Sequence, residues 1–341
     1  MGVGLHAPTV RRRLLMATCA IALGSLASGC VYQASAVSAL RSTPAAATVP
    51  RVLGVHPSTA PGKGGTQIIV LGQGFTPATA ITVGGVHARV VSVRNPGAVL
   101  AIIPPGIGSE VVRAVTNVGV SAANSSSVVH FTNRVLVVGD SLGIDLGWGF
   151  TPSLDASHSL SVTDEAVGSS GLVRTDFYNW PAHLRADIAA THADVVVTMF
   201  GTNDQQVLGT PSGPAQPGTA AWNRAYAARV RQITAVVHDA RATIVWVSLP
   251  RMGPRAWLSP QIVSDMVTLD GSVVSALPRA AFVNSWVVFT TPGGAYTPYV
   301  ELAPNVWVLG HSGDEIHLTP AGATVIVDKA VHSLHRSLLG R

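Results

Sequence analysis

The stretch Val135-Leu136-Val137-Val138-Gly139-Asp140-Ser141-Leu142 decides the fold of the longest part of this 341-residue chain. An apolar run that ends at a glycine is typical of a buried strand that leads into a turn. Further runs of this kind recur downstream, at residues 161–167, 194–200, 243–249 and 281–285. Stretches with helical spacing lie between and after them, most clearly at 220–240 and 320–339. The alternation predicts an α/β fold for residues 134–341, with a central parallel sheet that helices cover on both faces.

Polar strings follow three of these predicted strands, and a fourth string lies near the end of the chain. Ligands of parallel α/β sheets bind beyond the carboxyl ends of the strands, so we expect the strings to meet at one edge of the sheet. The strings are Gly139-Asp140-Ser141-Leu142, Gly168-Ser169-Ser170-Gly171, Gly201-Thr202-Asn203-Asp204 and Asp314-Glu315-Ile316-His317.

In this order, the strings resemble the sequence blocks of the GDSL/SGNH hydrolase family over roughly residues 134–341. The resemblance implies an SGNH-type three-layer α/β/α sandwich in which Ser141 is the nucleophile. It assigns Gly171 to the second block, Asn203 to the third, and Asp314 with His317 to the last. The surroundings of Trp180 and Trp222 are similar to a secreted bacterial branch of that family.

The residue types also suit this chemistry on physical grounds. A serine hydroxyl needs a base within hydrogen-bond reach, and His317 can take the Ser141 proton and return it to a leaving alcohol. Asp314 can accept the other imidazole N–H and stabilise the imidazolium. The predicted oxyanion hole consists of the backbone N–H groups of Ser141 and Gly171 and the side-chain amide of Asn203. The reaction needs no cofactor, and we predict none.

Each string has a plainer interpretation as well. A Gly-Asp-Ser turn after a strand is common, Asn203 could stabilise a turn, and Asp314 could be a surface charge. His311, Asp314 and His317 are also spaced as metal ligands could be, but no further cluster of carboxylates or histidines completes such a site, so we predict no metal. The sequence has no P-loop and no dinucleotide-binding fingerprint.

Residues 51–133 follow a different pattern, of short β-branched runs separated by turn residues, which predicts a small all-β sandwich. The ordered glycines Gly64-Gly65, Gly72-Gln73-Gly74-Phe75 and Gly84-Gly85 resemble an IPT/TIG domain, an immunoglobulin-like module. The resemblance implies that Phe75 anchors the core. A spacer or packing module is the plainer function, and a contact surface for an anionic wall polymer or a partner protein is the alternative.

The net charge of +5 and the sequence pI near 9.7 could indicate a nucleic-acid partner. The position of the charges argues against it. Residues 1–50 carry a net +4 and residues 51–133 a net +4, whereas residues 134–341, which hold the predicted chemistry, carry a net −3. We therefore predict an ester substrate and no nucleic acid.

The first 32 residues are typical of an export signal, because three consecutive arginines at 11–13 precede the apolar run 14–27. That run is too short to span a bilayer comfortably, since a spanning helix needs about 20 residues. Residues 33–50 are rich in Ala, Ser, Thr and Pro, which predicts a flexible tether. The protein is therefore expected to be exported, either extracellular or associated with the cell envelope.

Both cysteines, Cys19 and Cys30, lie in this leader, so the folded part has no disulfide. Leu26-Ala27-Ser28-Gly29-Cys30 resembles a bacterial lipoprotein box, with Ala27 where leucine is usual, so Cys30 is a candidate lipid anchor. Simple cleavage after Ala34-Ser35-Ala36 is the alternative. Membrane contact is expected only through the signal or this anchor.

The sequence thus predicts an exported serine esterase that forms an acyl-enzyme, with O-acetyl groups on a cell-envelope polysaccharide as a candidate substrate. Two other functions stay open. The same site could pass the acyl group to a sugar, as an O-acyltransferase does. The chain could instead be a non-catalytic envelope-binding protein that kept the hydrolase fold.

Overall fold

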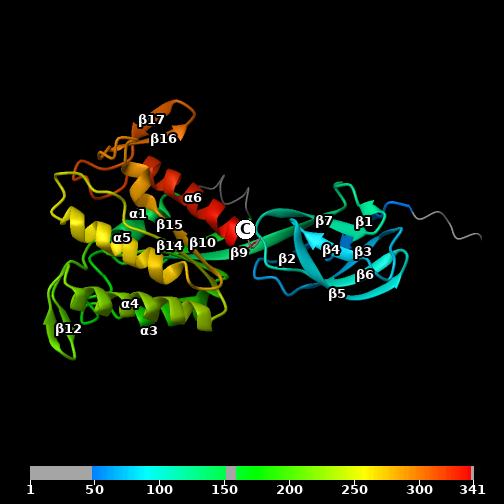
Figure 1. Cartoon of the computed structure of the whole chain (residues 1–341), viewed down its shortest axis with the longest axis horizontal. Helices are drawn as coiled ribbons and strands as arrows, with labels where there is room; N and C mark the ends of the chain where they lie inside the picture. Colours follow the sequence, from blue (N-terminus) through cyan, green and yellow to red (C-terminus); the bar gives the residue numbers. More distant parts are fainter. Residues whose placement is uncertain (1–47, 151–158, 339–341) are drawn as a thin grey trace, which may run out of the picture. The chain divides into compact units, whose positions relative to one another are not determined.

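The computed structural model describes residues 48–150 and 159–338. The predicted export signal, the candidate anchor Cys30 and nearly all of the predicted tether therefore lie outside the described residues. Two folded modules follow one another along the described chain (Figure 1). Each has its own cluster of buried apolar side chains.

The first module is an all-β sandwich, as predicted, drawn in blue and cyan in Figure 1. Its strands pair in the order β1-β3-β6-β5-β4-β7-β9, with β2 parallel to β9 and β8 antiparallel to β7. They are β1 (Arg51–His56), β2 (Thr59–Pro61), β3 (Gln67–Gln73), β4 (Ala80–Val83), β5 (Val86–Asn95), β6 (Ala98–Ile102), β7 (Ser109–Thr116), β8 (Gly119–Val120) and β9 (Val128–Gly139).

The sandwich encloses a core of β-branched and aromatic side chains. Ile68 and Val70 on β3 are both fully buried, and the residues between and beside them are more exposed, as the two-residue period of a strand requires. Phe75 is 4% exposed and belongs to this core, in agreement with the IPT/TIG resemblance.

The second module has a five-stranded sheet in which all neighbouring strands are parallel, in the order β10-β9-β11-β14-β15. The strands after β9 are β10 (Leu160–Asp164), β11 (Val195–Met199), β14 (Thr243–Val247) and β15 (Ala280–Val283). Every residue of β11 and β14 is buried, which explains why these segments are continuous apolar runs rather than alternating ones.

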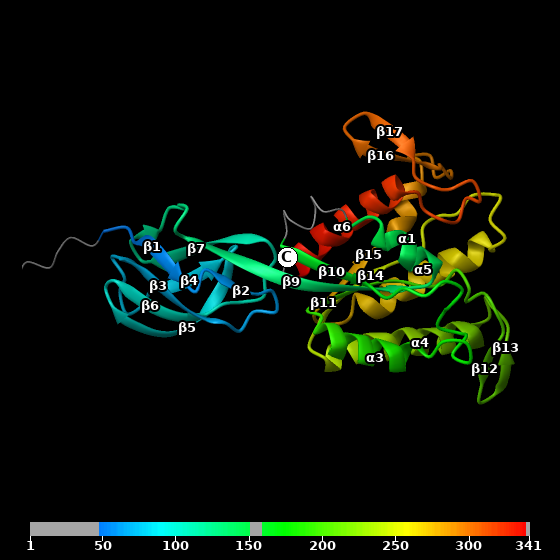
Figure 2. The same cartoon turned by 180° about the vertical axis from the view of Figure 1, so that it is seen from behind.

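Helices cover both faces of this sheet (Figures 1 and 2). Helices α1 (Ser141–Gly147) and α6 (Pro320–Leu338) contact each other on one face, and α3 (Trp180–Thr191), α4 (Ala220–Asp239) and α5 (Pro260–Val274) cover the other. The predicted three-layer α/β/α sandwich is therefore confirmed.

The helices start where side chains can satisfy the free backbone N–H groups of the first turn. Asn179, Thr219 and Ser259 cap α3, α4 and α5, and each accepts a hydrogen bond from a first-turn amide. Thr319 accepts from Gly322 N at 3.2 Å, which fixes the start of α6 at Pro320, three residues after His317.

Strand β9 is one continuous strand that pairs with strands of both modules, and residues 133 and 134 lie within it. The segment 205–219, which follows the string 201–204, contains a small hairpin of β12 (Leu208–Thr210) and β13 (Gly213–Ala215).

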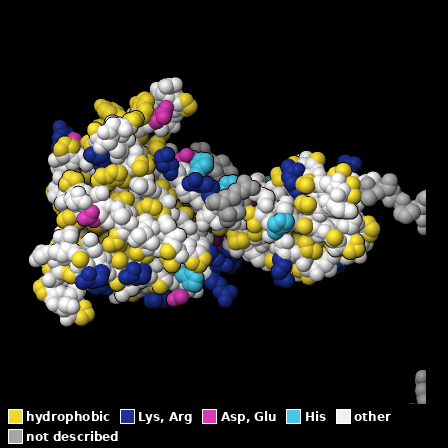
Figure 3. Space-filling model, viewed as in Figure 1, with side chains coloured by type: hydrophobic (Ala, Val, Ile, Leu, Met, Phe, Trp, Pro, Cys, Tyr) yellow, Lys and Arg dark blue, Asp and Glu magenta, His cyan; other side chains and the backbone are white. Residues whose placement is uncertain are grey.

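A second hairpin of β16 (Tyr299–Ala303) and β17 (Val306–Leu309) follows the short helix η1 (Ser285–Phe289). It carries hydrophobic side chains on its surface together with an acidic one (Figure 3). The exposed apolar residues are Tyr299, Leu302, Val306, Trp307 and Leu309. Among the described residues, no helix is long and apolar enough to cross a membrane.

The centre of the parallel sheet should dominate the stability of the second module. Leu136 on β9 is fully buried, so Leu136→Ala is expected to lower the free energy of unfolding by about 2–5 kcal/mol. Urea unfolding followed by tryptophan fluorescence measures this, because all seven tryptophans lie beyond residue 134. Leu302→Ala, at a side chain that is 45% exposed, is the matched control and should change it by less than about 0.5 kcal/mol. Equal losses in the two variants would contradict the assigned core.

Candidate active site

The site begins where β9 ends. Gly139 has a φ of +156°, and a Cβ atom there would lie 2.1 Å from the carbonyl oxygen of Met199, so only glycine fits between the two strands. The chain then turns sharply, and Ser141 becomes the first residue of α1. Because it opens the helix, the N–H of Ser141 has no intrahelical acceptor and can serve another group.

Asp140 caps this helix and ties it to the neighbouring strand. Its Oδ1 accepts from Leu142 N at 3.0 Å, and its Oδ2 accepts from Gly201 N and Thr202 N, each at 2.9 Å, and from the Thr202 hydroxyl at 2.5 Å. Burial raises the pKa of Asp140, and these four hydrogen bonds oppose that rise. The carboxyl group therefore fixes the strings 139–142 and 201–204 side by side.

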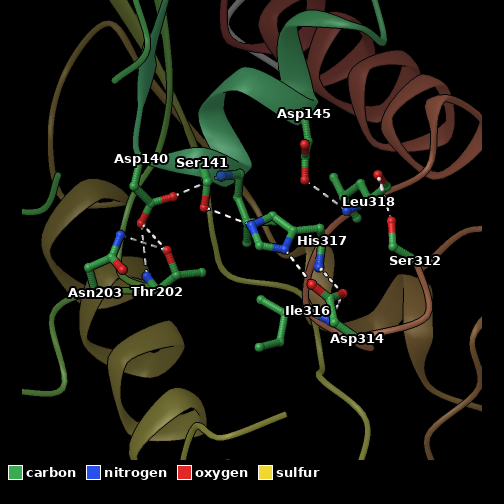
Figure 4. Close-up of polar contacts among 11 residues, drawn as sticks. Asp140, Ser141, Asp145, Thr202, Asn203, Ser312, Asp314, Ile316, His317 and Leu318 are labelled. Carbon is green, nitrogen blue, oxygen red and sulfur yellow. Dashed lines mark hydrogen bonds and ion pairs between the residues drawn. The ribbon is translucent and has the colours of Figure 1, made fainter. Parts of the chain in front are cut away.

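Ser141, His317 and Asp314 form a continuous line of hydrogen bonds (Figure 4). Ser141 Oγ lies 2.9 Å from His317 Nε2, and His317 Nδ1 lies 2.6 Å from Asp314 Oδ2. The side chains of His317 and Asp314 are 39% and 46% exposed, so the line lies at the surface and not in the core.

The loop that carries Asp314 and His317 holds both side chains by local contacts. Asp314 Oδ1 accepts from the backbone N–H groups of Ile316 and His317, each at 3.0 Å. Partial burial alone would raise the pKa of Asp314, but its hydrogen bonds with His317 and these amides outweigh burial and lower it. The carboxylate form is thus stabilised beside the imidazole.

Gly171 and Asn203 meet beside the same strand ends. Asn203 Nδ2 donates to Ser170 O at 2.9 Å, which places the amide next to the peptide that joins Ser170 to Gly171. The buried indole of Trp180 donates to Ser170 Oγ at 2.9 Å and holds this turn from behind. Among the described residues, the N–H of Gly171 has no hydrogen-bond acceptor.

Asp204 holds the backbone just after Gly171. It is fully buried and accepts from Leu172 N at 3.1 Å and from Val173 N at 2.8 Å. A Cβ at position 171 would lie 2.3 Å from Asp204 Oδ1, so glycine is required there. Burial raises the pKa of Asp204 to about 7, and the two backbone hydrogen bonds oppose the rise.

The metal alternative finds no support in the contacts of His311. Its ring stacks on Phe289 with 3.8 Å between centroids, and its Nδ1 lies 2.9 Å from the hydroxyl of Tyr296. Burial lowers the pKa of His311 to about 4, so the ring is neutral at physiological pH. In the part of the chain that the structure describes, no group of three or more His, Cys, Asp or Glu side chains could hold a metal ion.

The structure thus brings Ser141, Asp314 and His317 into contact and places Gly171 and Asn203 together at the same sheet edge. The candidate anchor Cys30 lies outside the described residues. The sequence analysis missed the supporting roles of Asp140 and Asp204, although both stand in the quoted strings. Their positions next to Ser141 and Asn203 were the only indication of these roles. Their hydrogen-bond partners are mainly backbone amides, which leave no pattern in the sequence.

The fold is a three-layer α/β/α module that follows an immunoglobulin-like β-sandwich. Residues 134–333 match the family described as protein of unknown function (DUF459), and the chain belongs to this family. Residues 50–132 match the IPT/TIG domain, which confirms that resemblance. No curated protein matches the chain.

Several solved structures resemble the chain at low identity. Acetylxylan esterase Axe2 from Geobacillus stearothermophilus is 13% identical, with a TM-score of 0.41, over 59% of this chain and 94% of that one. A GDSL-like lipase from Bacteroides thetaiotaomicron is 15% identical, with a TM-score of 0.40, over 59% and 86%. Esterase EstA from Pseudoalteromonas sp. is 13% identical, with a TM-score of 0.39, over 59% and 96%.

The raised pKa of Asp204 predicts how stability depends on pH. In the unfolded chain an aspartate has a pKa of about 3.9. Between about pH 4 and pH 7, Asp204 in the folded protein therefore keeps a proton that it loses in the unfolded chain. The contribution of Asp204 to stability therefore falls as pH rises through this window. Asp204→Asn has no charge to gain, so its free energy of unfolding should fall less than that of the wild type between pH 5 and pH 8.

Urea unfolding at several pH values measures this difference. Asp239→Asn, at an exposed position, is the control and should follow the wild type. If the Asp204→Asn protein showed the same pH dependence as the wild type, the assigned burial of the charge would be wrong.

Proposed function

We propose that this chain is a serine esterase in which Ser141 is the nucleophile, His317 the general base and acid, and Asp314 the residue that orients His317. The observation that carries the proposal is the hydrogen-bonded line from Ser141 Oγ through His317 to Asp314, with distances of 2.9 and 2.6 Å. A neutral serine becomes a useful nucleophile when a base can remove its proton as the new bond forms.

The reaction has two halves. Ser141 Oγ bonds to the ester carbonyl carbon while His317 Nε2 accepts the hydroxyl proton. The tetrahedral adduct then breaks its bond to the alkoxy oxygen, and the departing alcohol takes the proton from His317. In the second half, water gives a proton to His317 and attacks the acyl group. Release of the carboxylic acid returns the proton to Ser141.

The negative charge of each tetrahedral adduct needs fixed donors. The N–H groups of Ser141 and Gly171 and the side-chain amide of Asn203 are the proposed donors, because all three stand at the same strand ends. Asp140 holds the backbone beside Asn203 and Asp204 holds the backbone beside Gly171. The backbone N–H groups of Ser141 and Gly171 are held in place and do not have to reorganise when the charge develops. The Asn203 amide donates to Ser170 O and to the Thr202 hydroxyl, and it would share or exchange one of these bonds for the oxyanion.

We propose an O-acetyl group on a cell-envelope polysaccharide as the substrate. The exposure of His317 and Asp314, 39% and 46%, supports it, because an ester carried on a bulky polymer can reach an open site. Product analysis with added glycan distinguishes hydrolysis, which yields free acetate, from transfer of the acyl group to a sugar.

Loss of the nucleophile gives the first test. Ser141→Ala is expected to lower kcat for 4-nitrophenyl acetate by about 10³-fold or more, and to abolish labelling by a fluorophosphonate. Ser169→Ala, at an exposed serine in the neighbouring turn, is the matched control and should leave both unchanged. A wild-type protein that hydrolyses no short-chain ester and takes up no label would refute the proposal.

Loss of an oxyanion donor gives the second test. Asn203→Ala is expected to lower kcat by about 10²–10³-fold, as removal of such a donor does elsewhere, while KM changes little. Steady-state kinetics on the same ester measures both. A variant with unchanged kcat would exclude Asn203 from the oxyanion hole.

Export and lipid anchoring are proposed from the leader sequence. In a bacterial host that lipidates exported proteins, the wild type should incorporate a labelled fatty acid and sediment with membranes. Cys30→Ser should lose the label, whereas Cys19→Ser, which keeps Cys30, should retain it. Equal labelling of the two variants would contradict Cys30 as the anchor, and retention in the cytoplasm would contradict export.

A further inference from the structure

The helix that carries Ser141 and the loop that carries His317 are joined by a second hydrogen bond beside the Ser141–His317 contact. Asp145 Oδ2, on α1, accepts from the backbone N–H of Leu318 at 2.8 Å (Figure 4). Leu318 follows His317 directly in the chain. The two bonds therefore connect neighbouring residues of the loop to residues of one short helix.

Helix geometry places the two bonds on one face of α1. Residues four apart lie on one face of a helix, about one turn or about 6 Å from each other along its axis. Ser141 and Asp145 have this spacing. A single hydrogen bond fixes a distance but leaves the loop free to tilt about it. A second bond one turn away removes that freedom, so the pair sets both the distance and the direction of the imidazole.

Hydrogen bonds within the loop that carries His317 hold its shape, but they do not attach it to α1. Ser312 N donates to His317 O at 2.7 Å, and Ser312 Oγ donates to Leu318 O at 3.4 Å. Asp314 Oδ1 accepts from the amides of Ile316 and His317. These bonds fix the shape of the loop, but none of them reaches α1. Among the described residues, the only side chain of α1 besides Ser141 that hydrogen-bonds this loop is Asp145.

The other side of the loop is held by a different segment. Gly253 N donates to Glu315 O at 3.1 Å, and Arg255 N donates to Glu315 Oε2 at 2.9 Å. These contacts anchor the loop to the segment after β14. They do not set the distance between the loop and Ser141. The position of the base relative to the nucleophile thus depends on α1.

We propose that Asp145 is a positioning residue that holds the His317 loop against the nucleophile helix, so that His317 Nε2 stays within reach of Ser141 Oγ throughout the reaction. The inference rests on the proposed esterase function. Asp145 touches neither the substrate nor the reacting atoms, and it acts through the backbone of Leu318.

The environment of Asp145 agrees with this role. The residue is 3% exposed, so water cannot replace the Leu318 amide as a partner without opening the contact between helix and loop. Burial raises the pKa of Asp145 to about 6, while the Leu318 amide and the charge of His317 oppose the rise. The charges of Asp314 and Asp140 add to the rise. An acidic group is thus kept at a buried position where a charge is costly.

Two substitutions separate the hydrogen bond from the bulk of the side chain. Asp145→Ala removes the acceptor, and kcat for 4-nitrophenyl acetate should fall about 10–100-fold with KM within about twofold, since small misplacements of catalytic groups have effects of this size. Asp145→Asn keeps an oxygen for the Leu318 amide, and its kcat should stay within about threefold of the wild type. Labelling of Ser141 by a fluorophosphonate should slow in parallel with kcat.

Asp270→Asn is the matched control. Asp270 on α5 is fully buried, and burial holds its pKa well above the ordinary value, but it does not hydrogen-bond the His317 loop. This variant should keep the kcat of the wild type, even if its melting temperature changes. All rates are taken per mole of folded protein, at a temperature well below each melting midpoint. If Asp145→Ala does not fold, Asp145→Ser replaces it, because a hydroxyl on Cβ is too short to reach Leu318.

The outcomes are distinct. Slow turnover in Asp145→Ala with recovery in Asp145→Asn supports the positioning role. Full activity in the alanine variant overturns it, and so does an asparagine variant that is as slow as the alanine variant, because the hydrogen bond would then not be what matters. An inactive, unlabelled wild type would refute the esterase proposal itself, which is a separate result.

Discussion

The carboxyl group of Asp140 is the interaction on which the rest of the site depends. It accepts four hydrogen bonds, from the first turn of α1 and from the turn after β11, and so joins the ends of two neighbouring parallel strands. Ser141 stands next to it on one side and Asn203 on the other. If this carboxyl group were lost, four buried donors would lack an acceptor, which costs far more than one missing contact.

Buried aspartates recur at each loop of the site, always with backbone amides as partners. Asp140 holds the turn at Gly201, Asp204 holds the segment after Gly171, and Asp145 holds Leu318. Backbone N–H groups are fixed in direction by the chain, so a carboxylate that binds them locks the loop itself and not merely a side chain. Burial raises the pKa of each of these three carboxyl groups, because a buried charge is unfavourable. The hydrogen bonds from the backbone amides oppose this rise.

The sequence predicted the parts of this structure that depend on composition along the chain. Buried parallel strands are apolar throughout, so the segments around Val137, Val197 and Val245 were recognisable, and the turns after them stood out by their glycines. The continuity of β9 through both modules was not predictable, because Asn133 and Arg134 interrupt the apolar pattern although their backbone still pairs with β10. The hairpin at 208–215 was missed because Gly and Pro usually indicate irregular loops. The role of Asp145 was missed because its partner is an amide 173 residues away.

The loops of the candidate site and the two hairpins differ in how strongly the fold constrains them. The side chains proposed for catalysis stand on loops that buried carboxylates fix to the sheet, so their geometry cannot change without a large loss of stability. The hairpin β12–β13 follows Asn203, and β16–β17 precedes His311. Each hairpin places a few side chains in the core, Leu208 and Ala215 in the first and Val300 in the second. Exposed apolar side chains on β16–β17, such as Trp307, contribute little to folding where they stand. These exposed positions can therefore change with little effect on the fold, whereas the residues that fix the loops cannot.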